Sequence, residues 1–226
     1  MRVNGPTAEG AGADATTGTD ADHTNELMSR YAKGDDGVFE QLYAAMASRL
    51  QRFCVRLAGA RADADDLLQE TFLRVHRARA TYLPGANAMY WAFAIARSVH
   101  LDRLRYRRRR PEAPGSANDV AEDHALPTDD RYSPEAEART RDLVEVVTRE
   151  LRRMSEKNRA AYVLLQEEGI GVKEAATVLG TTPDVVKQRA HRAYEQLRTA
   201  VEAAGWNERS EPARDAARNR TRPDSI

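Results

Sequence analysis

The stretch KEAATVLGTTPDVVKQRAHRAYEQLR, residues 173–198, decides the fold of this chain. Two adjacent alanines at 175–176 let two helices approach closely, and Gly180 permits a tight turn between them. Thr182 and Pro183 then signal a new helix, with an oxygen cap followed by proline at the first helical position. This order of signals predicts a helix-turn-helix.

The second helix of this motif carries the side chains expected of a helix that enters the DNA major groove. Its early residues would meet base edges and its arginines would meet phosphates. The polar residues concerned are Lys187, Gln188, Arg189, His191 and Arg192. A helical hairpin with a solvated charged face is the alternative interpretation. We favour DNA binding because small residues, a turn glycine and a basic second helix occur together.

A second basic segment, residues 95–110, lies upstream and suggests contact with a separate stretch of the same nucleic acid. Its arginine run comprises Arg103, Arg105, Arg107, Arg108, Arg109 and Arg110. Such a run alone is more often a solvated face or a non-specific polyanion patch. It is preceded by the aromatic residues Tyr82, Tyr90, Trp91 and Phe93. Rings beside arginines suit single-stranded bases, but helical aromatics are also common in cores, so we expect Trp91 or Phe93 to be buried.

Helical periodicity dominates the rest of the chain. One apolar face repeats at three and four residues through Val38, Leu42, Met46, Leu50 and Phe53. A second helix, capped by Asp63, carries apolar Leu67, Leu68, Phe72 and Val75. Since no strand-like alternation is present, we expect an all-α protein.

The acidic residues in the first turns of this second helix allow two interpretations. They are Asp63, Asp65, Asp66 and Glu70. Carboxylates are favourable near a helix N-terminus because of the helix dipole. Their leucine and phenylalanine neighbours also allow a protein-docking face, and the residues alone do not choose between the two.

An acidic, proline-containing linker separates two helical parts of the chain. Compact domains mostly span about 50 to 200 residues, so 226 residues interrupted by such a linker favour two small domains. Ser155 is expected to cap a helix in the second domain that ends at Gly169. The expected organisation is a flexible extension at 1–23, a helical domain at 24–110, the linker at 111–133, a second helical domain at 134–204 and a flexible tail at 205–226.

Composition restricts the partners and the compartment. Lys and Arg number 35 and Asp and Glu number 35, so the formal net charge is +0 and the isolated protein should bind DNA weakly. The single cysteine, Cys54, lies in an apolar pattern, which favours buried packing in a reducing cytosol. The longest apolar run, residues 90–96, is too short to span a bilayer, and no signal peptide is recognisable. We expect a cytoplasmic protein without membrane insertion.

An enzyme is a further class of function to weigh. The histidines are His23, His76, His100, His124 and His191. They are scattered without metal-ligand spacing, and no glycine-rich phosphate loop occurs. We therefore expect no catalytic residue, no metal and no cofactor.

Several motifs carry a resemblance to a known family. DDLLQETF at 65–72, WAFAIAR at 91–97 and DRLR at 102–105 closely resemble region two of the extracytoplasmic-function (ECF) sigma factors of bacterial RNA polymerase. The pattern KEAA at 173–176, with the residues that follow it to 198, resembles their region four. Together the resemblance covers nearly all of residues 24–203.

The resemblance implies two sets of contacts for the first domain. A face of the second helix would dock on the coiled coil of the polymerase clamp, through Asp65, Asp66, Gln69, Glu70 and Phe72. The loop at 81–88 and the following helix would hold the melted non-template strand of the minus-ten element, with one base flipped into a pocket. The residues implied are Tyr82, Asn87, Tyr90, Trp91, Arg97, Arg103 and Arg105.

For the rest of the chain the resemblance implies further partners. The helix at 182–194 would read the minus-thirty-five element as duplex, with Thr182, Pro183 and Asp184 joining the polar residues named above. Apolar residues of that domain would pack on the polymerase flap, and the acidic linker would thread the active-centre cleft. Family members are commonly sequestered by an anti-sigma factor, which is often membrane-bound.

These expectations describe an alternative sigma factor that gives core RNA polymerase its promoter specificity and helps to melt the minus-ten region. The alternative is a helix-turn-helix regulator that binds DNA without becoming a polymerase subunit. Such a regulator should bind duplex DNA tightly on its own, whereas a sigma factor should need the polymerase.

Overall fold

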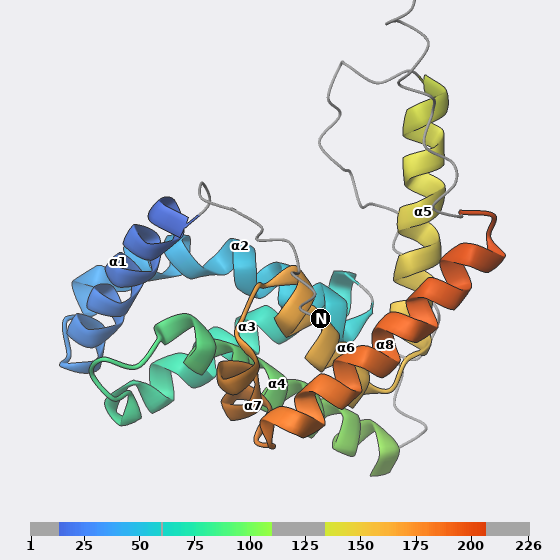
Figure 1. The fold of residues 1–226 in the computed structure, drawn as a ribbon. Helices are drawn as coiled ribbons and strands as arrows, with labels where there is room; N and C mark the ends of the chain where they lie inside the picture. Colours follow the sequence, from blue (N-terminus) through green and yellow to red (C-terminus); the bar gives the residue numbers. More distant parts are fainter. Residues whose placement is uncertain (1–13, 60, 110–133, 207–226) are drawn as a thin grey trace, which may run out of the picture.

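The computed structural model describes residues 14–59, 61–109 and 134–206, and every regular element within these ranges is a helix (Figure 1). The all-α prediction is confirmed. The expected linker at 111–133, residues 1–13 and the tail beyond Trp206 lie outside the described residues.

The first unit is a bundle of four helices. They are α1 (Asp14–Ala32), α2 (Phe39–Ala58), α3 (Arg61–Ala78) and α4 (Ala88–Arg109), with 3-10 turns at Asp36–Val38 and Arg79–Thr81. The apolar face predicted for α2 is buried, and α2 ends at Gly59 with φ +82°, a left-handed conformation that suits glycine. Asp63 does not cap α3, because α3 begins at Arg61.

The expected flexible extension is partly wrong, because α1 begins at Asp14 and residues 14–23 are helical. Leu27 and Tyr31, in the second half of α1, are buried and fix this helix to the bundle. Once that part of the helix is fixed, the helix can extend towards the N-terminus by propagation, without the cost of a new nucleation step. Composition predicted that this segment buries little, but it could not show that a neighbouring anchor supports it.

The second unit contains the predicted helix-turn-helix. Its helices are α5 (Pro134–Arg153), α6 (Glu156–Tyr162) continued by a π-helical turn at Val163–Glu167, α7 (Val172–Leu179) and α8 (Pro183–Ala203). Gly180 adopts φ +59° between α7 and α8, and Oγ1 of Thr182 accepts a hydrogen bond from the Val185 amide at 3.4 Å. Ser155 caps α6 by accepting from the Asn158 amide at 3.4 Å. The start and turn signals predicted from sequence are confirmed.

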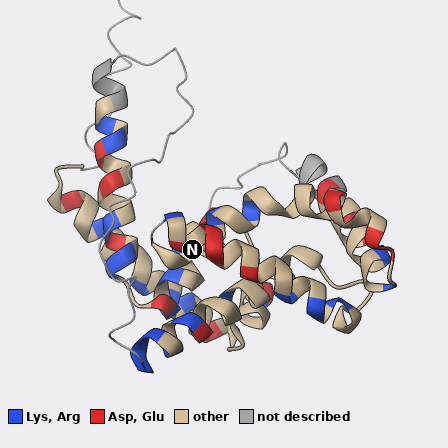
Figure 2. Cartoon of the chain, turned by 180° about the vertical axis from the view of Figure 1, so that it is seen from behind, with Lys and Arg blue, Asp and Glu red and all other residues tan. Residues whose placement is uncertain are grey.

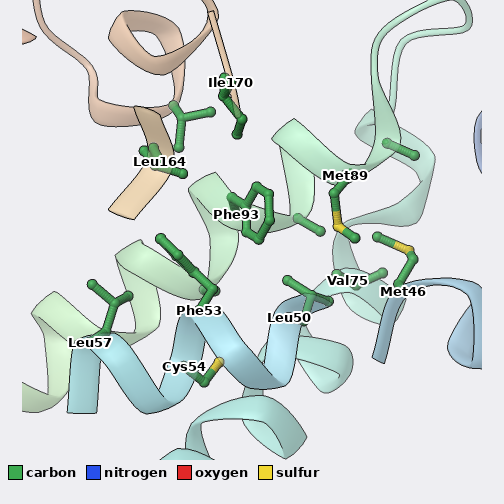
Figure 3. Packing of buried hydrophobic residues seen from close by; sticks show 14 of the residues in the cluster. Met46, Leu50, Phe53, Cys54, Leu57, Val75, Met89, Phe93, Leu164 and Ile170 are labelled. Carbon is green, nitrogen blue, oxygen red and sulfur yellow. The ribbon is translucent and has the colours of Figure 1, made fainter. Parts of the chain in front are cut away.

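The two units pack against each other. Residues of α4 lie on α7, and residues of α2 lie on α6. Phe93 of α4 is fully buried, with its ring 4.7 Å from that of Phe53, and Figure 3 places Leu164 and Ile170 of the second unit beside it. This confirms that one of the two helical aromatics is core, and it makes one apolar cluster continuous across both units.

Candidate nucleic-acid and protein interfaces

The predicted duplex-reading residues share one region of α8. Val186, Ala190, Ala193 and Leu197 are buried, which turns the opposite face of the helix outward. The exposed members of the predicted set are Thr182, Pro183, Asp184, Lys187, Gln188, His191 and Arg192. Arg189 lies at the edge of this face and is half-buried. The structure therefore brings the whole set to one end and one side of a single helix.

The loop between α3 and α4 is built by two of the residues predicted to touch DNA. Tyr82 is only 4% exposed, its hydroxyl donates to the Ala86 carbonyl, and its ring meets Trp91 edge-on at 5.5 Å. Oδ1 of Asn87 accepts from the Tyr90 amide at 3.1 Å and so caps the start of α4. Tyr82 presents no free ring face for stacking, which departs from the prediction for that residue.

Leu83 is a candidate in this loop that the sequence did not single out. It is 73% exposed, immediately after the buried Tyr82. Tyr90 and Trp91, at the start of α4, are half-buried. Nothing in the order of residues reveals which of two adjacent apolar side chains points outward, so this candidate needed the structure.

The three predicted basic contacts on α4 have different surroundings. Arg97 is held by the second unit, with Nε 2.9 Å from Oε1 of Glu156 and Nη1 3.3 Å from the Leu179 carbonyl oxygen. Arg103 donates to backbone carbonyls at the start of α3. Arg105 is exposed and pairs with Asp102 on the same helix at 2.8 Å. Of these three arginines, Arg105 is the accessible one. The basic last turn of α4, which follows it, lies at the lower left of Figure 2.

The predicted docking face on α3 is largely exposed. Asp65, Asp66 and Gln69 are accessible, and Glu70 is half-buried with Oε1 4.0 Å from Nη2 of Arg74. Phe72 is different, because it is buried with its ring 4.5 Å from that of Tyr43. Its side chain does not project into solvent and lines an apolar groove beside this face.

An apolar groove of about 690 Å³ adjoins this face. It is lined by Tyr31, Asp36, Phe39, Tyr43, Asp65, Leu68, Gln69, Phe72, Leu73 and His76. Leu73 is 44% exposed although it is apolar, and Tyr43 is exposed as well. The sequence signal for Leu73 is its position one helical turn after Gln69, which places an apolar side chain on an otherwise polar face.

Comparison with known proteins identifies the family. The family models for Sigma-70 region 2 and Sigma-70, region 4 match residues 42–110 and 145–197. The RNA polymerase sigma factor CarQ of Myxococcus xanthus is 35% identical over 171 residues, which cover 76% of this chain and 93% of that protein. The ECF RNA polymerase sigma factor SigM of Mycobacterium tuberculosis is 31% identical over 172 residues, covering 76% of this chain and 81% of that protein. The chain belongs to the ECF RNA polymerase sigma factors.

The fold of this sigma factor also resembles a solved structure. The sigma factor RpoE, in its complex with the anti-sigma factor NepR from Bartonella quintana, superposes with a TM-score of 0.58 at 22% identity. The similarity covers 73% of this chain and 96% of that chain. As a member of this family, the protein directs RNA polymerase to promoters, and action as a separate DNA-binding regulator is not favoured.

Two titratable groups of the sigma factor are buried. Burial, followed by the charges of Arg159, Arg107, Arg103 and Arg97, lowers the pKa of His100 from 6.5 to about 4. Burial raises the pKa of the Cys54 thiol to about 12. Both groups are therefore neutral at physiological pH and belong to the packing of the first unit.

Two further searches concern only the described residues. Within them, no cluster of three or more His, Cys, Asp and Glu side chains could hold a metal ion. In the same ranges, no helix combines the length and the hydropathy needed to cross a membrane.

Proposed function

We propose that this sigma factor contacts core RNA polymerase through α3, reads the minus-thirty-five element with α8 and holds the melted minus-ten strand with α4 and its preceding loop. The observation that carries the proposal is the coexistence of three separate exposed surfaces. They are the acidic face of α3, the loop at Leu83 and the polar face of α8. A regulator that acts alone would need only the last of them.

The α8 surface suits duplex recognition. Thr182, Pro183 and Asp184 lie at the N-terminal end, where backbone amides favour a DNA phosphate. Lys187 and Gln188 follow on the exposed face, and Arg192 lies one helical turn after Gln188. Gln188 and the cations near it can meet base edges, while Arg192 and His191 lie further along and can meet phosphates.

The loop and α4 suit a separated strand. Leu83 exposes an apolar side chain that can wedge against an unstacked base, and Tyr90 and Trp91 lie just behind the loop. Arg105 supplies an accessible cation for the phosphates. Tyr82 and Asn87 contribute by holding the loop in shape and not by touching DNA.

The α3 surface suits a protein partner. Asp65 and Gln69 form a polar rim of the groove that contains Leu73 and Tyr43, and the exposed Asp66 adds a second carboxylate on the same helix. An apolar floor with an acidic rim fits a helical partner that carries both apolar and basic side chains. The coiled coil of the polymerase clamp is the partner we assign to it.

The remaining assignments concern partners and place. We propose that the second unit binds the polymerase flap. We also expect an anti-sigma factor to sequester the protein. The division into two domains on either side of residues 111–133, a cytoplasmic location and the lack of any catalytic activity belong to the same proposal. A sigma factor works by binding and positioning, so no reaction has to be carried by its side chains.

Run-off transcription tests the proposal directly. Core polymerase with this protein should initiate from a promoter that neither component transcribes or binds specifically alone. If the protein without polymerase binds that duplex tightly and specifically, and adds nothing to transcription by the core enzyme, the assignment to the three surfaces is wrong.

A further inference from the structure

One acidic side chain lies among the cations on the proposed reading face of α8. Asp184 is the only Asp or Glu within residues 182–194, whereas Lys187, His191 and Arg192 are exposed basic residues of the same segment. DNA phosphates repel a carboxylate, so Asp184 lowers the attraction of this face for the DNA backbone. If this side chain contacts DNA, its partner has to be a base and not a phosphate.

Stability of the helix start does not by itself account for Asp184. Oγ1 of Thr182 already caps the first turn of α8 by accepting from the Val185 amide at 3.4 Å. Pro183 occupies the first helical position, where its fixed φ favours a helix. A first-turn carboxylate adds an interaction with the helix dipole, but salt screens that interaction when the side chain is exposed.

Asp184 and Lys187 form an exposed pair at the beginning of α8. The Asp184 side chain is 96% exposed, and its Oδ1 lies 4.0 Å from Nζ of Lys187, whose side chain is 65% exposed. Val186 and Ala190 are buried, so they fix the opposite side of the helix to the second unit. Gln188 lies one helical turn after Asp184 on the exposed face. A hydrogen-bond acceptor and a donor thus lie side by side at the end of the helix that meets base edges.

The major-groove edges of the bases decide what this pair can bind. A carboxylate only accepts hydrogen bonds, and two bases donate there, cytosine through N4 and adenine through N6. On adenine the amino group adjoins N7, an acceptor that repels a carboxylate oxygen, whereas cytosine presents the donor alone. The guanine paired with that cytosine offers O6 and N7 to an ammonium group. A C·G base pair therefore matches both side chains.

We propose that Asp184 and Lys187 read one C·G base pair of the minus-thirty-five element, with the carboxylate on cytosine N4 and the ammonium group on the paired guanine. This inference rests on the proposed function of α8 and names a base that the helix selects. Guanine or thymine in place of the cytosine would set an acceptor against the carboxylate. Asp184 is then a specificity-determining residue that lowers affinity for DNA in general and raises discrimination.

The test begins by identifying the element that the protein reads. Holoenzyme made from core polymerase and the parent protein selects fragments from a pool of duplex DNA of random sequence. Each base pair of the selected minus-thirty-five element is then varied singly, and run-off transcription measures the preference at every position. The parent should prefer cytosine at one position by about tenfold over the other bases.

Asp184→Asn changes the hydrogen-bonding chemistry and keeps the size of the side chain. Asparagine both donates and accepts, so it pairs with N7 and N6 of adenine. The preference at this one position should move from cytosine to adenine, while the other positions keep theirs. Asp184→Ala should remove the preference at the same position, and Lys187→Ala should weaken it. A role in helix stability alone would produce no such change of base.

The matched control is Glu195→Gln, which removes a carboxylate three turns further along α8. Glu195 pairs with Arg198 at 2.7 Å and lies outside the proposed reading set. This variant should keep the base preferences of the parent. Circular dichroism of all variants checks that their helical content is equal.

The outcomes separate this inference from the proposed function. A cytosine preference that survives Asp184→Asn and Asp184→Ala overturns the inference, and so does a parent that prefers bases in the element but no cytosine at a position sensitive to Asp184. If both variants raise transcription equally from every template, Asp184 only repels phosphates and the inference is wrong. If the parent holoenzyme shows no base preference anywhere in the minus-thirty-five region, the proposed function of α8 itself is wrong.

Discussion

Arg103 donates a hydrogen bond from Nη2 to the backbone carbonyl oxygen of Asp66 at 2.7 Å. The two residues belong to surfaces proposed for different partners, the minus-ten strand and the polymerase. Arg103 also reaches the Asp63 carbonyl oxygen at 3.4 Å, so it fixes α4 to the first turns of α3. Loss of Arg103 would therefore disturb both surfaces, and tests of either should use residues with a single role, such as Asp66 or Arg105.

Polymerase docking should depend on the acidic rim of α3. Changing Asp66 and Glu70 to lysine reverses the charge of the acidic face of α3, because the two residues lie one helical turn apart on that helix. The double variant should lose co-purification with core polymerase while its circular dichroism stays unchanged. The charge-matched control changes Asp22 and Glu26 to lysine, on the exposed side of α1. Normal co-purification of the α3 variant would contradict the docking assignment.

Duplex reading should depend on the exposed face of α8. Alanine at Lys187, Gln188 or Arg192 should reduce transcription from promoters that require the upstream element. A lost base contact removes about 1–3 kcal/mol of discrimination, whereas a lost phosphate contact weakens all sequences alike. Arg198→Ala is the control, since Arg198 pairs with Glu195 and Glu202 further along the same helix. If the effects of the α8 substitutions and of changes in the upstream element on transcription are independent, then this face of α8 does not read that element.

Local signals explain why the helix-turn-helix could be predicted from sequence. The left-handed Gly180 and the cap at Thr182 act within a few residues, so their consequences do not depend on distant contacts. The buried face of α2 was equally predictable, because periodicity alone separates its two sides.

The parts that could not be predicted depend on distant contacts. Glu156 lies 59 residues from Arg97, and no local pattern indicates that the two form an ion pair. Tyr82 and Leu83 are adjacent apolar residues in one loop, yet the first is buried and the second is exposed. The side of a loop residue is decided by the helices that it packs on, which are assembled only in the fold.

The thiol of Cys54 should be unreactive in the folded protein. The side chain is fully buried, and burial raises its pKa to about 12, so almost no thiolate is present at neutral pH. A thiol-specific reagent should modify Cys54 rapidly in denaturant and extremely slowly without it. Equal rates in both conditions would show that α2 is open to solvent at this position.

Acid should destabilise the protein through His100. Its folded pKa is about 4, below the ordinary value of 6.5, because the ring is buried and arginines surround it. Between these values the unfolded chain binds a proton that the folded protein excludes, so the free energy of unfolding falls as the pH falls. Nε2 of His100 has no hydrogen-bond partner among the described residues, so no hydrogen bond at this atom stabilises the neutral ring.

The size of this effect can be measured against a variant that does not titrate. From pH 7 to pH 5, denaturant unfolding should show the parent losing about 2 kcal/mol more than His100→Gln. Carboxylates titrate in both proteins, so the comparison isolates His100. If the parent and the variant lose equal free energies of unfolding, the ring of His100 is in contact with solvent and the prediction is wrong.

Promoter melting should depend on Leu83 more than strand binding does. Leu83→Ala removes an exposed wedge, and an apolar or stacking contact to one base is worth roughly 1–3 kcal/mol. Holoenzyme with this variant should initiate about tenfold less often on closed duplex promoters and recover on a promoter with a pre-melted bubble, whose opening is already complete. Arg105→Ala is the comparison, because a phosphate contact serves both templates and its loss should weaken both. A Leu83 variant that is equally defective on both templates, or normal on both, would leave the loop without a role in opening DNA.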